Sequence, residues 1–369
     1  METKLREIKE GKTFFLVPEF ENKKGPGKKR SGFYNPTMEM NRDISILIVQ
    51  WLVDTANKSV KILDGLAASG ARGVRIANEV EGDFFVTIND WNKKAFNLIL
   101  RNAKSFDNVE GVCENVNCLL HKKRFHYVDI DPFGTPVPYI DAAVKNVIPG
   151  GVLAVTATDT ATLCGVYPKT CIRRYGAMPL HSWIKHEVGL RILIGYICRE
   201  AAKYDRGVEA LFSHSTDHYM RVYVRLRKGA EEANESLKKV KTVDAVDFTY
   251  ENNENRETEV GPLWVGKLHN KAVLKKLQNI IPRKTLGKRR DVEKLLTRAY
   301  EEVDLPIFFY TVDVLSSQLK VSPPKPFHVL EKLKELGFRA GGTQFGDTSF
   351  KTDAPREEVY RVFEEVSSS

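Results

Sequence analysis

The stretch from residue 60 to residue 90 reads VKILDGLAASGARGVRIANEVEGDFFVTIND and contains one complete unit of an α/β fold. Its aliphatic residues predict a strand at 60–63, the run 71–81 predicts a helix, and 83–88 predicts a second strand. A turn of small residues at 65–70 joins the first strand to the helix. Strand, helix and strand in this order predict a right-handed crossover between parallel strands.

The same alternation continues towards the C-terminus. Further strands are predicted at 111–114, 125–130 and 151–156, with helices at 92–104 and 135–146. This order predicts a parallel sheet that helices cover on both faces. In such a sheet the functional residues lie at the carboxyl ends of the strands.

The predicted sheet ends differently from how it begins. After a long helix at 182–203 come two strands, 208–215 and 219–226, which only three residues separate. A connection this short requires an antiparallel hairpin. A Rossmann-like parallel sheet that ends in an antiparallel hairpin is typical of class I S-adenosylmethionine-dependent methyltransferases, so the sequence predicts that α/β fold.

We expect two domains: a methyltransferase domain at 1–228, with an N-terminal extension that contacts cofactor or RNA, and a smaller C-terminal α/β domain at 229–369. The charged stretch 228–241 leads into the second domain. The later elements expected are helices at 270–279 and 291–303, a strand at 308–312, helices at 314–320 and 327–336, a hairpin within 338–352 and a helix at 355–366. Their order resembles a winged helix, which would bind nucleic acid. A small module that only packs on the first domain is the alternative.

The first strand-to-helix turn is a candidate cofactor site. Small residues between Asp64 and Gly73 let a ligand approach the backbone, and the amides that open the helix favour negative groups. Asp90 follows Gly70 by twenty residues, at the end of the second strand, where a carboxylate can accept both hydrogen bonds of a ribose diol. Asp64 and Asp90 are therefore candidate cofactor-binding residues. A purely structural turn is the alternative.

The segment Tyr127–Gly134, at the end of the fourth strand, is a candidate catalytic site. Asp131 and the carbonyl of Pro132 can form two acceptors for the two N–H bonds of an exocyclic base amine. Asp131 can also take the proton that the alkylated nitrogen must lose, and Phe133 can stack on the base. A buried aspartate followed by a turn is the alternative.

Composition excludes several classes of protein. The chain has 369 residues, 42% of them hydrophobic and 28% charged, which rules out a disordered or fibrous protein. The run 44–53 is about half as long as a membrane span. A charged N-terminus without the apolar core of a secretory signal predicts a cytoplasmic protein. The five cysteines are odd in number and irregularly spaced, so free thiols are expected.

The net charge of +9 is concentrated in two basic runs. One lies at 23–30 and the other at 283–290. Such runs suit a phosphate backbone, although solvated loops are the alternative reading of each run. Phe33 comes soon after the first run, as expected of a loop that contacts phosphate and then stacks a flipped base. An ordinary core aromatic is the alternative for Phe33.

Across nearly its whole length the sequence resembles the tRNA guanine-26 N2-dimethyltransferases. The resemblance is carried by a series of motifs in a fixed order: Gly11–Pro18, Phe33–Met38, Asn41–Asp43, Asp64–Gly73, Asn89–Asp90, Asp129–Gly134, Val155–Asp159, Leu163–Gly165, His186–Arg191, Asp217–Tyr219 and Gly261–Trp264. The combination is far more specific than any one of its motifs. It implies S-adenosylmethionine as cofactor and tRNA as partner.

The resemblance also implies roles for single residues. Asp131 would be the catalytic base, and Phe33 and Phe133 would enclose the target guanine. The residues that would hold the cofactor are Arg42, Arg72 and Asp90, with Asn115 and Val116 beside the adenine. Here the chain departs from the family, which usually has an acidic residue near 115. Some members carry a cysteine cluster before the Gly-Pro-x-Trp motif, but 248–259 contains no cysteine, so no metal is expected.

The sequence thus predicts an enzyme that transfers one or two methyl groups from S-adenosylmethionine to N2 of a guanine in tRNA. Two rivals remain: a DNA methyltransferase that acts on adenine N6 or cytosine N4, and a non-catalytic RNA-binding protein. Phe133-Gly134 in place of Pro-aromatic argues against the first rival. The number of methyl groups and the oligomeric state are open, with a monomer slightly favoured.

Overall fold

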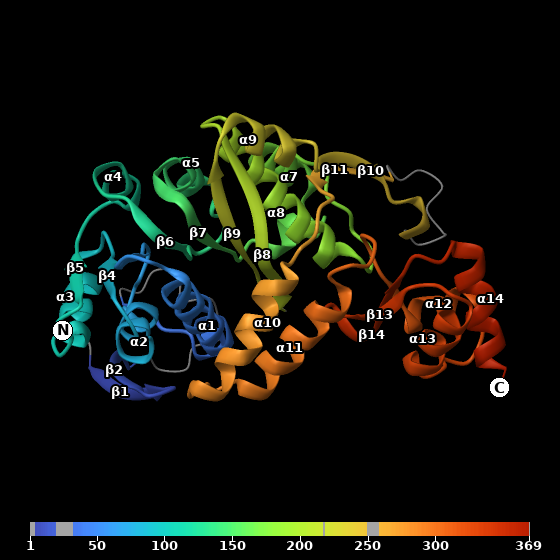
Figure 1. Ribbon diagram of the computed structural model, residues 1–369, viewed down its shortest axis with the longest axis horizontal. Coiled ribbons are helices and arrows are strands. Elements are labelled where there is room, and N and C mark those ends of the chain that lie inside the picture. The colour runs from blue at the N-terminus through green and yellow to red at the C-terminus, as the bar shows by residue number, and fades with distance from the viewer. Residues whose placement is uncertain (1–3, 20–31, 217, 249–257, 369) are drawn as a thin grey trace.

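The computed structural model describes residues 4–19, 32–216, 218–248 and 258–368, so the basic run at 23–30 lies outside the described residues. Its centre is a seven-stranded sheet in the order β5-β4-β3-β6-β7-β9-β8 (Figure 1). The strands are β3 (Val60–Asp64), β4 (Phe84–Asn89), β5 (Val109–Val112), β6 (Phe125–Ile130), β7 (Val147–Ala157), β8 (Arg206–Thr216) and β9 (Tyr219–Lys228).

The first five strands of this sheet are parallel, and β9 lies antiparallel between β7 and β8. The predicted hairpin is therefore confirmed, and its second strand, not its first, joins the parallel part of the sheet. The predicted fold class is confirmed as well.

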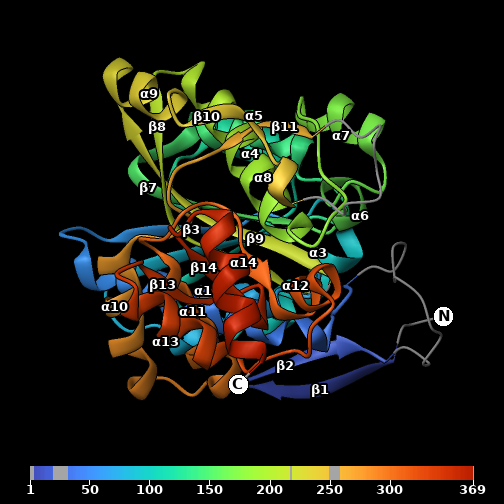
Figure 2. The ribbon, with the colours of Figure 1, turned by 90° about the vertical axis from the view of Figure 1, so that its right-hand side faces the viewer.

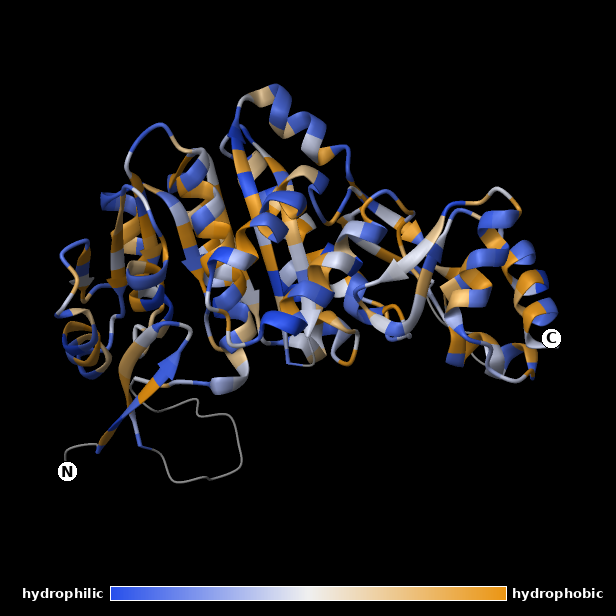
Figure 3. Ribbon diagram, turned by 60° about the horizontal axis from the view of Figure 1, so that its bottom comes forward, coloured by the Kyte–Doolittle hydropathy of each residue, from blue (hydrophilic) through white to orange (hydrophobic). Residues whose placement is uncertain are grey.

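Helices cover both faces of the sheet because successive side chains of a strand point to opposite sides. In β6, Tyr127 faces one core, and Val128 and Ile130 face the other. The first core includes α1 (Glu39–Thr55), α2 (Ala71–Glu79) and α3 (Lys93–Ala103), and the second includes α4 (Val116–Lys122), α5 (Val137–Asn146) and α8 (Lys185–Ala202). Figure 3 shows hydrophobic residues along the strands of the sheet, while hydrophobic and hydrophilic residues alternate along the helices.

Shorter elements surround the sheet. An N-terminal hairpin, β1 (Leu5–Glu10) and β2 (Thr13–Pro18), packs against α2 and α3. The remaining short elements are η1 (Pro36–Met38), α6 (Thr160–Leu163), α7 (Pro168–Tyr175), α9 (Ala230–Leu237), β10 (Val240–Asp244), η2 (Val246–Phe248), β11 (Glu259–Trp264) and η3 (Ile281–Arg283). All five cysteines are free.

The hydrophobic cores divide later in the chain than the boundary at 228/229. The charged stretch forms α9, which packs on β8, and the helices α10 (Lys271–Ile280) and α11 (Arg289–Glu302) pack on α1 in the first core. A separate core begins at Tyr310. These apolar helix faces are buried on the sheet domain, and the domain boundary at 228/229 stays a prediction.

The C-terminal unit has its own three-stranded sheet in the order β12-β14-β13. Its elements are β12 (Tyr310–Thr311), α12 (Val312–Leu319), α13 (Pro326–Glu335), β13 (Ala340–Thr343), β14 (Gly346–Thr352) and α14 (Arg356–Ser367). The order of helices and hairpin follows the sequence prediction. Figure 2 shows this unit in front of α10 and α11. No helix in the described ranges is long and apolar enough to cross a membrane.

Candidate active site

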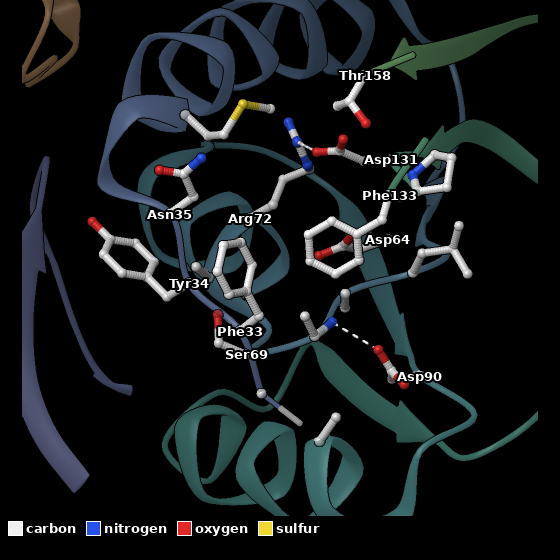
Figure 4. A pocket seen from close by; sticks show the side chains of 18 of the residues that line it. Phe33, Tyr34, Asn35, Asp64, Ser69, Arg72, Asp90, Asp131, Phe133 and Thr158 are labelled. Atoms are coloured by element: carbon white, nitrogen blue, oxygen red, sulfur yellow. Dashed lines mark hydrogen bonds and ion pairs between the residues drawn. The ribbon is translucent and has the colours of Figure 1, made fainter. Parts of the chain in front are cut away.

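A pocket of about 790 Å³ opens at the carboxyl ends of β3, β4, β6 and β7 (Figure 4). It brings together residues that the sequence analysis selected from five separate segments. They are Phe33, Arg42, Asp64, Arg72, Asp90, Asp131, Pro132 and Phe133. Further lining residues that the motifs contained, but to which no role was given, include Tyr34, Asn35, Thr158, His218 and Tyr219. Trp91, just after the Asn89–Asp90 motif, also lines the pocket.

The turn after β3 is shaped by glycines at two positions. Gly70 has φ +79° as the N-cap of α2, a conformation that glycine adopts without strain. At Gly73 an added Cβ would lie 2.5 Å from Ile88 Cγ1, so only glycine lets α2 pack this close to β4. The backbone N–H of Gly73 donates to Asp64 Oδ2 at 2.9 Å. The turn therefore fixes the carboxylate at the floor of the pocket.

The pKa of Asp64 lies far above the usual value of an aspartate. Burial raises its pKa to about 7, and Asp129 and Asp131 also raise it, while Arg72 lowers it. Together, three carboxylates (Asp64, Asp129, Asp131) surround two guanidinium groups (Arg72, Arg221), which leaves one negative charge in excess when all are ionised. This surplus suits a cationic group such as a sulfonium.

Asp90 lies at the rim of the turn, as predicted. Its Oδ2 accepts from the backbone N–H of Ala68 and its Oδ1 from that of Asn92, each at 2.9 Å. Burial raises its pKa. Each oxygen keeps one free acceptor site, so a diol can still be bound.

Arg72, in the helix that follows the turn 65–70, contacts Asp131, the residue predicted to be the catalytic base. One of its nitrogens donates to Asp131 Oδ2, and another donates to Asn41 Oδ1 at 2.7 Å. Asp129, beneath it, forms ion pairs with Arg72 at 3.5 Å and with Arg221 at 2.6 Å. Burial raises the pKa of Asp129, but Arg221 and Arg72 outweigh that effect, so the net shift is downward. Both aspartates thus reach the same guanidinium.

Arg42 is held in the pocket wall by Glu10, a residue that the sequence analysis did not select. Its Nε donates to Glu10 Oε2 at 2.7 Å, and its Nη2 donates to the backbone oxygen of Asn35 at 3.0 Å. Burial raises the pKa of Glu10, but the combined effects of Arg42, Tyr34 and Arg75 lower it. The hairpin β1–β2 therefore contributes to the site by orienting Arg42.

The rings of Phe33 and Phe133 contact each other edge to face, with centroids 5.1 Å apart and an interplanar angle of 63°. A base is about 3.4 Å thick, so enclosing one between the rings requires roughly 7 Å. The pocket brings the two predicted rings together, and one of them must move before a base can lie between them.

Asn115 and Val116 do not line this pocket. Asn115 is the N-cap of α4 and accepts from Asn117 N–H at 2.9 Å, and Val116 is buried beside Gly65. Their place beside an adenine stays a prediction. Among the described residues no group of three or more His, Cys, Asp or Glu is arranged to hold a metal ion.

The sheet with its antiparallel hairpin, together with three strand-end carboxylates and a glycine turn at one pocket, defines a class I S-adenosylmethionine-dependent methyltransferase. The model of the family described as "N2,N2-dimethylguanosine tRNA methyltransferase" matches residues 11–364. The chain belongs to this family.

Relatives cover its whole length. The tRNA (guanine(26)-N(2))-dimethyltransferase of Methanobrevibacter smithii is 36% identical over 389 residues, which cover 100% of this chain and 99% of the relative. The protein of the same name from Pyrococcus furiosus is 38% identical, with 99% of each chain covered. The structure of Trm1 from Pyrococcus horikoshii with S-adenosyl-L-methionine has a TM-score of 0.85 and 34% identity, and covers 98% of this chain and 99% of that one.

Proposed function

We propose that the protein transfers methyl groups from S-adenosylmethionine to N2 of a guanine in tRNA, at position 26 as in the names of its relatives. The observation that carries this proposal is a shared pocket: Asp131 lies in the same cavity as the turn after Asp64 and as Asp90. A base amine bound by Asp131 is then close to a cofactor bound by the turn.

The chain's own residues have distinct parts in the reaction. S-adenosylmethionine supplies an activated methyl group, so alignment provides most of the catalysis. Asp131 and the Pro132 carbonyl accept the N–H bonds of the amine, and Asp131 takes the proton that the methylated nitrogen releases. Phe33 and Phe133 stack on the base, and Arg72 keeps the Asp131 carboxylate in place.

The RNA is bound, in our proposal, across both domains, with 229–369 as the tRNA-binding part. The second basic run lies beside the start of α1, because Lys288 N–H donates to Asp43 Oδ2 at 2.8 Å. Lys284 is buried and bonded to the backbone oxygen of Glu79, so it serves packing. Arg283 is exposed but forms an ion pair with Asp54 at 2.7 Å, so the exposed Lys288 and Arg290 are the members that we propose contact phosphate. We propose that the enzyme acts in the cytoplasm, and a monomer is slightly favoured.

Mass spectrometry of nucleosides tests the proposal. Unmodified tRNA incubated with enzyme and methyl donor should yield N2-methylguanosine or N2,N2-dimethylguanosine, and replacing G26 by adenine should abolish it. Methylated adenine or cytosine from duplex DNA would support the first rival. Bound but unmethylated tRNA would support the second.

Asp131→Ala tests the assignment of the base. We expect turnover to fall by about 10²–10⁴-fold, as when a general base is lost, with the cofactor Kd changed only a few-fold. The matched control is Asp107→Ala, at an exposed position outside the pocket, which should behave as wild type. Loss of cofactor binding in Asp131→Ala would show that its role is misplaced.

A further inference from the structure

Asn35 is held in one orientation by its own backbone turn. It caps η1 with φ −118° and ψ 112°, and Pro36 follows it at the first position of this 3-10 turn. Its Oδ1 accepts from the Thr37 N–H at 3.0 Å and from the Thr37 hydroxyl at 2.8 Å. Since an amide oxygen accepts and an amide nitrogen cannot, these two bonds decide which way the side chain points.

The other end of this amide faces the pocket. Figure 4 shows the nitrogen of Asn35 turned towards Arg72 and Asp131, with the oxygen turned away. In the described part of the chain, Nδ2 makes no hydrogen bond, although Asn35 lines the pocket. Arg72, by contrast, already donates to Asp131, Asn41 and Ser45. Asn35 therefore offers two N–H donors for which the described residues supply no acceptor.

The chemistry of guanine provides an acceptor for these donors. When Asp131 holds the N2 amine, the next exocyclic group around the six-membered ring, beyond N1, is the carbonyl oxygen O6. An adenine held by its N6 amine presents only C2–H in that position. A donor that meets O6 therefore distinguishes guanine from adenine, because a base without the oxygen leaves the donor unpaired.

We propose that Asn35 is a specificity-determining residue whose Nδ2 donates a hydrogen bond to O6 of the target guanine. The inference rests on the proposed function and adds to it a recognition of the base edge remote from the reacting amine. A backbone contact supports this placement. The backbone oxygen of Asn35 accepts from Arg42 Nη2 at 3.0 Å, which holds the loop against the pocket wall.

The test combines Asn35→Ser with an altered base. Serine still caps the turn at Thr37 but has no amide donor. 2-Aminopurine at the target position keeps the N2 amine and N3 but carries hydrogen in place of O6. For guanine RNA we expect Asn35→Ser to lower kcat/KM by about tenfold, the loss typical of one hydrogen bond. For 2-aminopurine RNA we expect no change between wild type and variant.

Controls separate this inference from its alternatives. Asn270→Ser makes the same replacement at the N-cap of α10, away from the pocket, and should affect both RNAs equally or not at all. Equal losses on both RNAs in Asn35→Ser, or a raised cofactor Kd, would overturn the assignment of O6. Absence of N2 methylation of guanine RNA by the wild-type enzyme would instead overturn the proposed function.

Discussion

The buried carboxylate of Asp64 shows how one residue can respond to a ligand's charge. Burial and the neighbouring aspartates raise its pKa to about 7, so near neutral pH it is partly protonated. A cation in the pocket stabilises its ionised form and lowers that pKa. We infer that binding of a sulfonium releases part of a proton from this site.

Replacing Asp64 by asparagine should change how stability depends on pH. Folded Asp64 keeps its proton up to about pH 7, whereas an unfolded aspartate loses it near 3.9. Between these values folding takes up a proton, so the stability of wild type falls as pH rises, by at most about 1.4 kcal/mol per unit. Asp64→Asn lacks this effect.

Urea unfolding at pH 5, 6, 7 and 8 measures the prediction. Relative to Asp64→Asn, wild type should lose stability from pH 5 to pH 7, and the difference should level off above pH 7. Asp83→Asn, at an exposed position, is the matched control. A difference between wild type and Asp64→Asn that does not vary with pH would contradict the shifted pKa.

At the scale of elements, the contact between α2 and β4 positions the turn 65–70, which we propose binds the cofactor. A methyl group at Gly73 would meet Ile88 Cγ1 at 2.5 Å and Cδ1 at 2.6 Å, and Ile88 is fully buried. Gly73→Ala should therefore destabilise the protein by about 1–3 kcal/mol, as overpacking does, and weaken cofactor binding because α2 shifts. Thermal unfolding and calorimetric titration measure the two effects.

A second substitution shows whether the cause is steric. Ile88→Ala removes both atoms that the new methyl would touch, so the double variant should be less destabilised than the sum of the single variants. Simple additivity would mean that Gly73 is needed for its backbone and not for close packing.

The elements differed in how far the sequence predicted them. Strands β3, β4 and β6 and the hairpin followed from short aliphatic runs and a three-residue connection. Helix α1 was not predicted, because residues 44–51 are buried all round and show no amphipathic period. The pairing of Arg221 with Asp129 depends on β9 lying beside β7, and hairpin signals do not reveal that order.

For the site residues, too, local sequence patterns predicted positions but not contacts. That Asp64, Asp90 and Asp131 lie in one pocket could be predicted because each ends a strand of one parallel sheet. The contacts that orient these side chains could not be predicted from the sequence. Glu10 reaches Arg42 from an N-terminal hairpin, and Arg72 bonds Asp131 across 59 positions of sequence. Such pairings depend on tertiary packing, which local patterns do not encode.

At the scale of the whole molecule, a buried ion cluster joins the C-terminal unit to the rest. Lys351 of β14 contacts Glu187 of α8 at 2.9 Å and Glu302 of α11 at 3.2 Å. Burial by itself would raise the pKa of Glu302, but Lys351 and His269 outweigh this effect and lower the pKa to about 2. Three otherwise separate parts of the fold therefore share one charge network.

Lys351→Met should loosen this junction. Removing the cation leaves two buried carboxylates with fewer partners, which typically costs about 3–5 kcal/mol. We expect differential scanning calorimetry to show a lower Tm, with the C-terminal unit unfolding before the sheet domain. Lys334→Met, at an exposed lysine of α13, is the control. A Tm equal to that of the control would show that the cluster contributes nothing to the junction.

The contact between Phe33 and Phe133 has a consequence for which nucleobases can occupy the site. When a base enters between the rings, the contact between Phe33 and Phe133 is lost and each ring gains a contact with the base. A purine covers both phenyl faces more fully than a single six-membered pyrimidine ring does, so it compensates better for the separation. With the stacking role that we propose for them, the two phenylalanines would sort bases by size before any hydrogen bond is made.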